Sequence, residues 1–257
     1  MCLVRNHRVR ICPYCHQTSE APVCVNDGCA ARRHGPRVAG MGDPLVGRIF
    51  ERRYRIDAVL AAGGFGVVYK GEQLALGRPV AIKLLHAHHA QSALESRRFQ
   101  REAQAIAALR HPNIVELYDF GHTREGYLYL VMEYLEGRTF RRLKEEEAPL
   151  PMARVVGFLT QLLDGLAEAH ARGIVHRDLK PENLFCARIG RRSEVVKILD
   201  FGVAKFIDEL SHFSTLTGHG STVGSPYYMS PEQAQAQAVS AQTDLYLVGL
   251  IAYELLS

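Results

Sequence analysis

The stretch HRDLKPEN occupies residues 176–183, and the triplet DFG follows at residues 200–202. Together they carry Asp178, Asn183 and Asp200 within a short length of chain. Carboxylate and amide oxygens are hard ligands suited to Mg²⁺, which keeps several waters and binds nucleotide phosphates through few protein groups. The Asp178 carboxylate is also able to accept a proton from an attacking hydroxyl. The pattern therefore favours a metal-assisted site for phosphate chemistry.

Two features nearer the N-terminus fit the same chemistry. The glycine-rich segment at residues 62–66 lies between predicted strands, and glycines let the backbone approach phosphate oxygens and point N–H groups at them. A plain hairpin turn would show the same residues. Lys83 ends the strand segment VAIK, and a lysine among apolar neighbours needs an anionic partner. Glu102 and the phosphates of ATP are the candidates; the alternative is a surface lysine and a glutamate on a helix face.

These motifs, in this order, resemble the protein-kinase family. HRDLKPEN with Lys180 resembles the Ser/Thr branch, and residues 169–185 (AHARGIVHRDLKPENLF) and 225–234 (SPYYMSPEQA) resemble bacterial kinases of eukaryotic type. The resemblance covers about Arg48 to Ser257. It implies an α+β, two-lobed kinase fold with a β-rich N-lobe and a helical C-lobe. It also implies transfer of the γ-phosphate of ATP to protein Ser/Thr hydroxyls in bacterial signalling.

The resemblance assigns catalytic roles by motif. Lys83 would hold the α- and β-phosphates, paired with Glu102. Asp178 would orient the substrate hydroxyl and act as base, Lys180 would contact the γ-phosphate, and Asp244 would anchor the catalytic loop. The metal would be Mg²⁺ or Mn²⁺, with Asn183 and Asp200 as its ligands.

The resemblance also assigns the nucleotide contacts. Met132 would be the gatekeeper, and the hinge that follows would bind adenine through its backbone. Ala61 stands where the family usually has a first glycine, so we expect weaker ATP binding rather than its loss. The expected contacts are Ala61, Gly63, Gly64, Gly66, Val68, Ala81, Lys83, Met132, Glu133, Leu135, Asn183 and Asp200.

Regulation is expected in the activation segment, which Ser230-Pro231-Glu232 would close. In the family, an arginine placed like Arg177 pairs with a phosphorylated residue of this segment, and a phosphate adds about −1.5 to −2 charge that can order a loop. The candidates are Thr217, Ser221 and Thr222, which would otherwise be ordinary loop hydroxyls. Self-association for autophosphorylation would follow from the same idea.

A cysteine-rich segment precedes the kinase-like region. Cys12-Pro-Tyr-Cys15 and the pair Cys24 and Cys29 resemble a zinc ribbon, in which thiolates on two turns form a tetrahedral Zn²⁺ site. Metal would supply folding energy to a segment with little apolar core. The spacing of the second pair is long, so His16 or His34 is an alternative ligand. A redox CxxC pair and unligated thiols are the other interpretations.

The composition of the chain limits the classes of protein to which it can belong. The 257 residues are 47% hydrophobic and 23% charged, which is typical of a globular chain. Residues 1–55 hold ten Lys/Arg against four Asp/Glu. Apart from Tyr14, the cysteine-rich segment and its basic neighbours lack the interleaved aromatics of a nucleic-acid site, so we expect no nucleic-acid partner. No run of 18 apolar residues occurs, so we expect no membrane segment in this chain and a cytoplasmic location. The expected partners are protein substrates.

Four regions are expected: a zinc ribbon at 1–34, a linker at 35–47, the kinase N-lobe and hinge at 48–135, and a partial C-lobe at 136–257. The family normally continues with further helices, so an incomplete C-lobe is expected. A non-catalytic kinase-fold scaffold or an inactive fragment is therefore the alternative function. Periodicity predicts strands at 54–60, 67–71, 79–85, 114–120 and 127–134, and helices at 94–109, 151–172 and 243–256.

Overall fold

The computed structural model describes residues 10–11, 18–19, 43–63, 66–85, 93–123, 126–190, 192–201 and 226–257. The four predicted zinc cysteines, Gly64 and the three candidate phosphorylation sites lie outside these ranges. The chain forms two compact units, each treated below by itself. Unit 1 comprises residues 1–96 and 120–131, and unit 2 comprises residues 97–119 and 132–257. The four-region division expected above stays a prediction.

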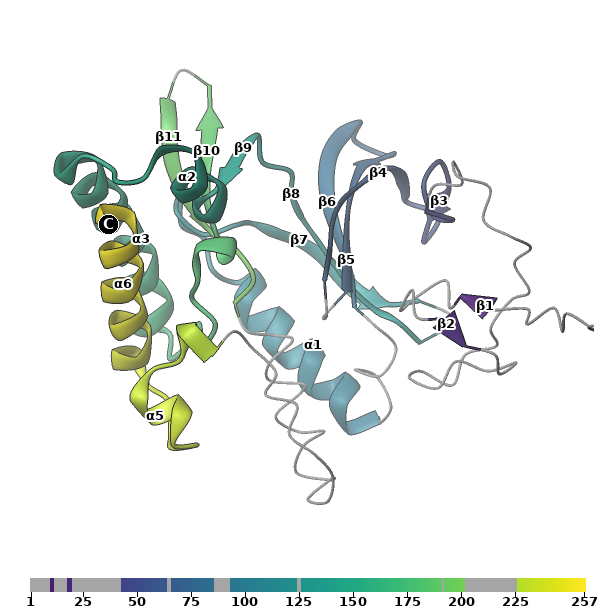
Figure 1. The fold of residues 1–257 in the computed structure, drawn as a ribbon. Coiled ribbons are helices and arrows are strands. Elements are labelled where there is room, and N and C mark those ends of the chain that lie inside the picture. The colour runs from purple at the N-terminus through teal and green to yellow at the C-terminus, as the bar shows by residue number, and fades with distance from the viewer. Residues whose placement is uncertain are drawn as a thin grey trace, which may run out of the picture. The chain divides into compact units, whose positions relative to one another are not determined.

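The largest sheet has six strands in the order β3-β4-β5-β6-β8-β7 (Figure 1). Its strands are β3 (Ile49–Phe50), β4 (Tyr54–Gly63), β5 (Gly66–Gln73), β6 (Arg78–Leu85), β7 (Leu117–His122) and β8 (Leu128–Glu133). The first four pair antiparallel with their neighbours in sequence, as short hairpin connections require. Most of this sheet lies in unit 1, whereas residues 117–119 of β7 and 132–133 of β8 belong to unit 2.

Alternating side chains explain these strands. Tyr54 and Ile56 of β4, and Val80 and Ile82 of β6, are almost fully buried and lie two residues apart, as a pleated strand requires. Tyr129 of β8 closes one end of this core. Its ring meets Phe50 edge-on at a centroid distance of 5.1 Å, and its hydroxyl accepts a 2.8 Å hydrogen bond from an Arg53 guanidinium nitrogen.

β4 is longer than the predicted strand, because the segment that we expected to turn begins as regular ladder. Ala61, Ala62 and Gly63 pair with Val68, Val67 and Gly66. Gly66 is required by sterics: its φ is +151°, and a Cβ there would lie 2.1 Å from the Leu84 carbonyl oxygen. The strand predicted at 54–60 therefore ended three residues too early.

A separate two-stranded antiparallel sheet is formed by β1 (Arg10–Ile11) and β2 (Thr18–Ser19). Arg10 pairs with Ser19 and Ile11 with Thr18. Cys12 and Cys15 lie in the sequence between these two strands.

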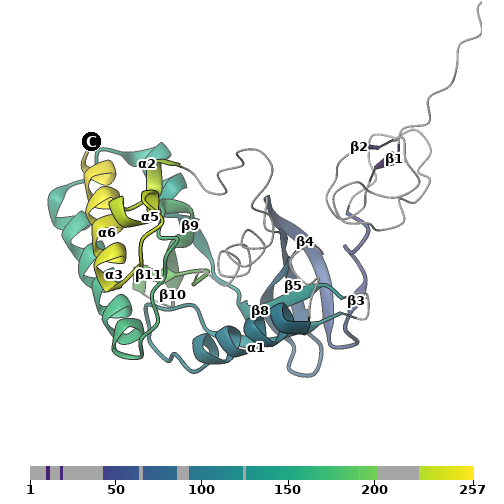
Figure 2. The same ribbon diagram turned by 90° about the horizontal axis from the view of Figure 1, so that it is seen from below.

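Unit 2 is mainly helical and carries a small sheet in the order β11-β10-β9 (Figure 2). From α1, only the part after Ser96 belongs to this unit. Its helices are α1 (Ala93–Ala107), α2 (Phe140–Glu147), α3 (Met152–Ala171), η2 (Pro181–Asn183), η3 (Pro226–Tyr228), α5 (Pro231–Ala234) and α6 (Ala241–Leu256). Its strands are β9 (Gly137–Thr139), β10 (Leu184–Ile189) and β11 (Arg192–Ile198).

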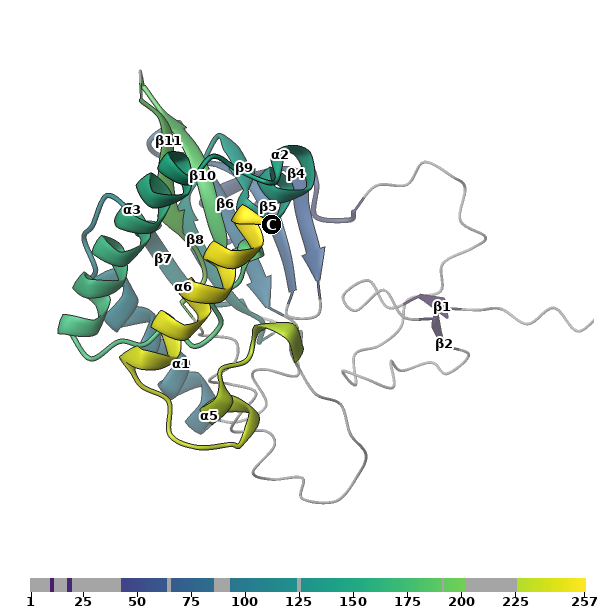
Figure 3. The ribbon, with the colours of Figure 1, turned by 60° about the vertical axis from the view of Figure 1, so that its left-hand side comes forward.

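The core of unit 2 forms where α3 packs against α6 and β11 (Figure 3). Val155, Phe158, Leu162 and Leu166 line the buried face of α3 at helical spacing. Gly165 lets β11 approach this helix, because a Cβ there would lie 2.9 Å from Ile198 Cδ1. Within the described ranges, no helix is both long enough and apolar enough to cross a membrane.

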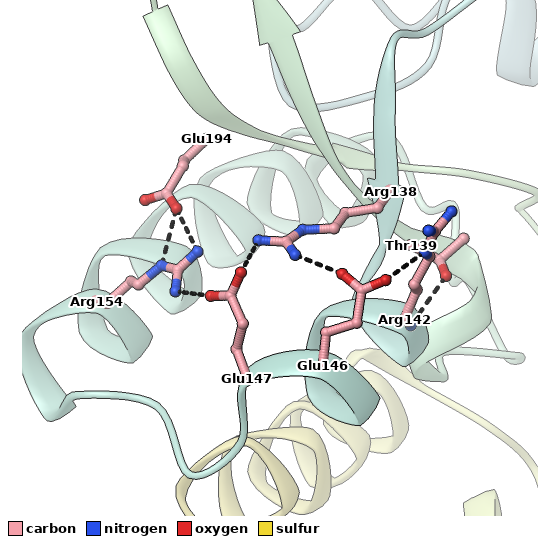
Figure 4. Close-up of polar contacts among 7 residues, drawn as sticks. All are labelled: Arg138, Thr139, Arg142, Glu146, Glu147, Arg154 and Glu194. Carbon is pink, nitrogen blue, oxygen red and sulfur yellow. Dashed lines mark hydrogen bonds and ion pairs between the residues drawn. The ribbon is translucent and has the colours of Figure 1, made fainter.

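An ion-pair network ties α2 to its neighbours (Figure 4). Arg138 of β9 contacts Glu146 at 2.7 Å and also Glu147, and Arg154 of α3 contacts Glu147 and, at 2.8 Å, Glu194 of β11. The pairs are partly exposed, so solvent screening keeps the contribution of each pair to stability small. The network therefore orients α2 rather than stabilising it strongly.

Candidate active site

The catalytic loop brings Asp178, Lys180 and Asn183 together in unit 2. Lys180 Nζ lies 2.8 Å from Asp178 Oδ2, and Asn183 Nδ2 donates to the same oxygen at 3.1 Å. Asn183 Nδ2 also donates to the Asp178 carbonyl at 2.8 Å. One side-chain oxygen of Asp178 is thus held by an ammonium and an amide, which fixes its direction.

Asp244 of α6 accepts hydrogen bonds from the backbone of this loop. It is fully buried, and its two carboxylate oxygens accept the backbone N–H groups of His176 at 2.8 Å and Arg177 at 3.0 Å. His170 Nε2, at the end of α3, lies 2.7 Å from the same carboxylate. Arg177 takes a positive φ of 66°, an unfavourable conformation for a side chain of this size. The carboxylate compensates by binding the loop at this position.

The ring of His176 links the loop to the strand that precedes Asp200. Its Nδ1 accepts the backbone N–H of Asp178 at 3.3 Å, so the ring proton lies on Nε2, which donates to the Leu199 carbonyl at 2.8 Å. The ring also packs against Phe201 at a centroid distance of 4.9 Å. Burial lowers the pKa of His176, and the neutral tautomer matches these two contacts.

Asn183 and Asp200, the predicted metal ligands, lie on adjoining segments because the Leu199 N–H donates to the Asn183 carbonyl at 2.8 Å. Asn183 Nδ2 is used by Asp178, so its amide oxygen is the atom available to a metal. One carboxylate and one amide oxygen fit Mg²⁺ that is otherwise held by phosphates and water. Among the described residues, no group of three His, Cys, Asp or Glu could hold a metal alone.

Glu133, which belongs to the predicted hinge, forms hydrogen bonds through both its backbone and its side chain. Its N–H donates to the Glu116 carbonyl at 3.0 Å, and its Oε1 accepts the Glu116 N–H at 2.9 Å and Lys197 Nζ at 2.6 Å. Met132, the predicted gatekeeper, is buried, and Leu135 is half-buried. Sequence reasoning missed Lys197; a lysine at the centre of the apolar run VVKIL was the available signal.

The predicted phosphate-side residues lie in unit 1 on one face of the sheet. Val68 pairs with both Ala61 and Lys83, and directly paired residues project to the same side. Ala81 lies two residues before Lys83 and shares that face. Val68 and Lys83 are half-buried, whereas the alternating neighbours of Lys83, Ile82 and Leu84, are buried. Glu102 lies on α1 in unit 2, and its pairing with Lys83 stays a prediction.

The segment after the activation region also contacts the catalytic loop. Ser230 and Gln233 form a capping box that starts α5, and Gln233 Nε2 donates to the Arg177 carbonyl at 2.7 Å. Glu232 contacts the Thr243 hydroxyl of α6. Sequence reasoning missed Gln233, although the S-x-x-Q spacing of a capping box marks it.

A pocket of unit 2 lies beside Arg177. Arg101 and Glu102 of α1, Arg172 and Phe201 also line it. The Arg172 guanidinium already contacts two groups of the protein: it forms an ion pair with Glu168 at 2.8 Å and donates to the Ala108 carbonyl at 3.2 Å. Three arginines and one glutamate line this pocket, so its lining carries a net positive charge, which favours an anionic group there.

Residues 54–257 match the protein kinase domain family, and the chain belongs to this family. Among curated proteins it is 40% identical over 215 residues to the serine/threonine-protein kinase pkn3 and 43% identical over 230 residues to Pkn1, both from Myxococcus xanthus. It is 38% identical over 213 residues to PrkC of Bacillus subtilis. These alignments cover 84%, 90% and 83% of this chain, but only 39%, 32% and 32% of the relatives.

Solved structures agree with this assignment. The kinase domain of Mycobacterium tuberculosis PknI superposes with a TM-score of 0.65 at 28% identity, covering 82% of this chain and 75% of that one. The protein-kinase fold expected from the motifs is therefore confirmed, as is the similarity to bacterial Ser/Thr kinases. The chain spans about two fifths or less of the length of these curated relatives.

Proposed function

We propose that this chain is an active protein kinase that transfers the γ-phosphate of ATP to Ser and Thr hydroxyls of protein substrates. The observation that carries the proposal is the Asp178, Lys180 and Asn183 cluster, whose charged groups are held at hydrogen-bond distance. A scaffold without catalysis would not need this ammonium–carboxylate–amide arrangement. Relatives named as Ser/Thr kinases at about 40% identity also favour the catalytic reading.

The transfer is an in-line displacement. The substrate hydroxyl oxygen forms a bond to the γ-phosphorus while the bond from that phosphorus to the β–γ bridging oxygen breaks, and ADP leaves. Asp178 accepts the hydroxyl proton. Lys180 offers positive charge to the γ-phosphate, and Lys83 does so for the α- and β-phosphates. Mg²⁺, when bound through Asn183 and Asp200, supplies charge neutralisation at the phosphate oxygens.

Labelled-ATP transfer by the full chain and by Asp178→Asn tests this function. We expect the substitution to lower kcat about 10²-fold or more, because a positioned general base contributes 10²–10⁴-fold. Asp164→Asn, at an exposed position of α3, is the matched control and should keep wild-type activity. Equal transfer by Asp178→Asn and wild type would point instead to the non-catalytic scaffold.

Regulation by phosphorylation of Thr217, Ser221 or Thr222 forms part of the proposal. The pocket with Arg101, Arg172 and Arg177 supports it, because it offers guanidinium groups beside the catalytic loop. Mass spectrometry of active protein should find phosphate on this segment. If the rate of modification rises with the square of the protein concentration, a second copy of the chain adds the phosphate. An unmodified segment in fully active protein would end this idea.

We also propose that residues 1–34 bind Zn²⁺ through Cys12, Cys15, Cys24 and Cys29. The antiparallel pairing of β1 and β2 supports this site, since Cys12 and Cys15 lie between these two strands in the sequence. Metal analysis of the full chain should give about one zinc per chain, lost in Cys12→Ser and kept in Cys2→Ser. Zinc content unaffected by Cys12→Ser would contradict the site. We also propose that the kinase region lies in the cytoplasm, where ATP and protein substrates are present.

A further inference from the structure

Lys197, on β11, is a buried lysine that contacts Glu133 and the backbone of Ile114. It is only 6% exposed, and lysine is rarely buried unless its charge is paired. Its Nζ lies 2.6 Å from Glu133 Oε1 and 3.4 Å from the Ile114 carbonyl oxygen. The ion pair joins two segments 64 residues apart in the chain, both within unit 2.

The partner of Lys197 is held by more than this pair. The same Glu133 oxygen accepts the Glu116 N–H at 2.9 Å, while the Glu133 N–H donates to the Glu116 carbonyl at 3.0 Å. Side chain and backbone of Glu133 are thus bound to one neighbour, and Lys197 completes the set. Because the Glu133 N–H already donates to the Glu116 carbonyl, a ligand at the hinge must bind the carbonyl of Glu133 or the backbone groups of later residues.

The strand that carries Lys197 continues into the candidate metal site. Ile198 N–H donates to the Asn113 carbonyl at 2.8 Å, and the Ile198 carbonyl accepts the Val115 N–H at 2.9 Å. Asp200 follows three residues after Lys197. The ion pair therefore connects the hinge backbone to the segment that ends at a predicted Mg²⁺ ligand.

We propose that Lys197 is a positioning residue for ATP: through its buried ion pair with Glu133 it holds the hinge backbone in the conformation that binds adenine. The inference rests on the proposed function, which gives the hinge that role. Without the ammonium, the Glu133 carboxylate would turn toward water, and the backbone of the same residue would lose its fixed place. A site organised before binding loses less conformational entropy when the ligand arrives, so its affinity is higher.

The test compares ATP with inorganic tripolyphosphate, which carries phosphates but no adenine. In Lys197→Met we expect the KM for ATP to rise about tenfold, the size of one hydrogen bond to a charged group. The kcat and the inhibition constant of tripolyphosphate should change less than about twofold, because the phosphate-binding groups are elsewhere. Lys197→Arg keeps the charge and should recover part of the ATP affinity.

Two further variants separate positioning from stability. Lys197→Met with Glu133→Gln removes both charges but leaves an amide oxygen to accept the Glu116 N–H, so no unpaired buried charge remains. It should fold and still bind ATP weakly. Asn113→Ala removes buried hydrogen bonds to Val196 (2.8 Å) and Gln161 (3.2 Å) next to the same strand, and should lower stability while leaving the KM for ATP unchanged.

Three outcomes would overturn the inference. They are an unchanged KM for ATP in folded Lys197→Met, equal weakening of ATP and tripolyphosphate, and wild-type affinity in the double variant. ATP binding by calorimetry accompanies the kinetics, so that loss of activity is not confused with loss of the site. Wild-type protein that binds no Mg·ATP would overturn the proposed function as well, whereas binding that is insensitive to Lys197 would overturn this inference alone.

Discussion

Asp244 of α6 accepts the backbone N–H of His176 at 2.8 Å, although the two residues are 68 positions apart in the chain. The carboxylate is fully buried, and its remaining contacts are to the Arg177 N–H and His170 Nε2. A side chain on the buried face of α6 therefore sets the backbone of the loop that carries Asp178. Charged acceptors make stronger hydrogen bonds than neutral ones, so this side chain is hard to replace.

Asp244→Asn should lower both stability and turnover. An amide can accept fewer of these donors and places its own N–H₂ against one of them. We expect the free energy of unfolding to fall by about 1–3 kcal/mol and kcat to fall at least about tenfold. Urea unfolding and labelled-ATP transfer measure the two effects, with Asp164→Asn as control. A folded variant with full kcat would show that the loop needs no such support.

The stability of unit 2 should depend on pH through His176. Burial lowers its folded-state pKa below the ordinary value of 6.5, so the unfolded chain takes up a proton more readily. The stabilisation from neutral His176 is therefore complete above about pH 6.5 and is lost as the pH falls toward the folded-state pKa. The slope contributed by one proton is at most about 1.4 kcal/mol per pH unit.

His176→Phe isolates this contribution. The variant keeps an aromatic ring against Phe201 but loses the contacts to Asp178 and Leu199 and the titrating group. It should be less stable than wild type at pH 7.5, and the difference should narrow by pH 5.5 in urea unfolding. A difference that stays constant or widens on acidification would mean that His176 is not neutral in the folded protein.

Gly66 and Gly63 should respond differently to the same substitution. Gly66→Ala places a Cβ 2.1 Å from the Leu84 carbonyl oxygen at a φ of +151°, and we expect a loss of about 1–3 kcal/mol or more in unfolding free energy. Gly63→Ala meets no atom within 4 Å and should leave stability nearly unchanged. Any rise in its KM for ATP would then report on phosphate approach. Equal stability of the two variants would contradict the described hairpin.

Cys186 should be unreactive in the native protein. The side chain is buried, and burial raises the pKa of its thiol, so little of the reactive thiolate forms. Brief iodoacetamide treatment at pH 8, followed by peptide mass spectrometry, should show labelling of Cys186 about 100-fold slower in native than in urea-unfolded protein. Comparable rates in the two states would mean that β10 opens readily.

Long periodic elements were predictable because their patterns repeat. The helix predicted at 151–172 is α3 at Met152–Ala171, and the strand predicted at 79–85 is β6 at Arg78–Leu85. The small sheet of β9, β10 and β11 and the short helix α2 were not predicted. β9 has only three residues and pairs with a strand far along the chain, so no local period marks it. β10 and β11 pair with each other as a hairpin next to it.

The local order of residues already indicated the family and its chemistry, because HRDLKPEN and DFG place a base, an ammonium and metal-binding oxygens at spacings that few other folds share. It could not indicate which backbone groups Asp244 binds, that His176 is neutral with its proton on Nε2, or that Lys197 pairs with Glu133. Those relationships join residues 23 to 68 positions apart. They exist only once packing has excluded water, because burial is what makes a single well-placed partner decide the charge and direction of each group.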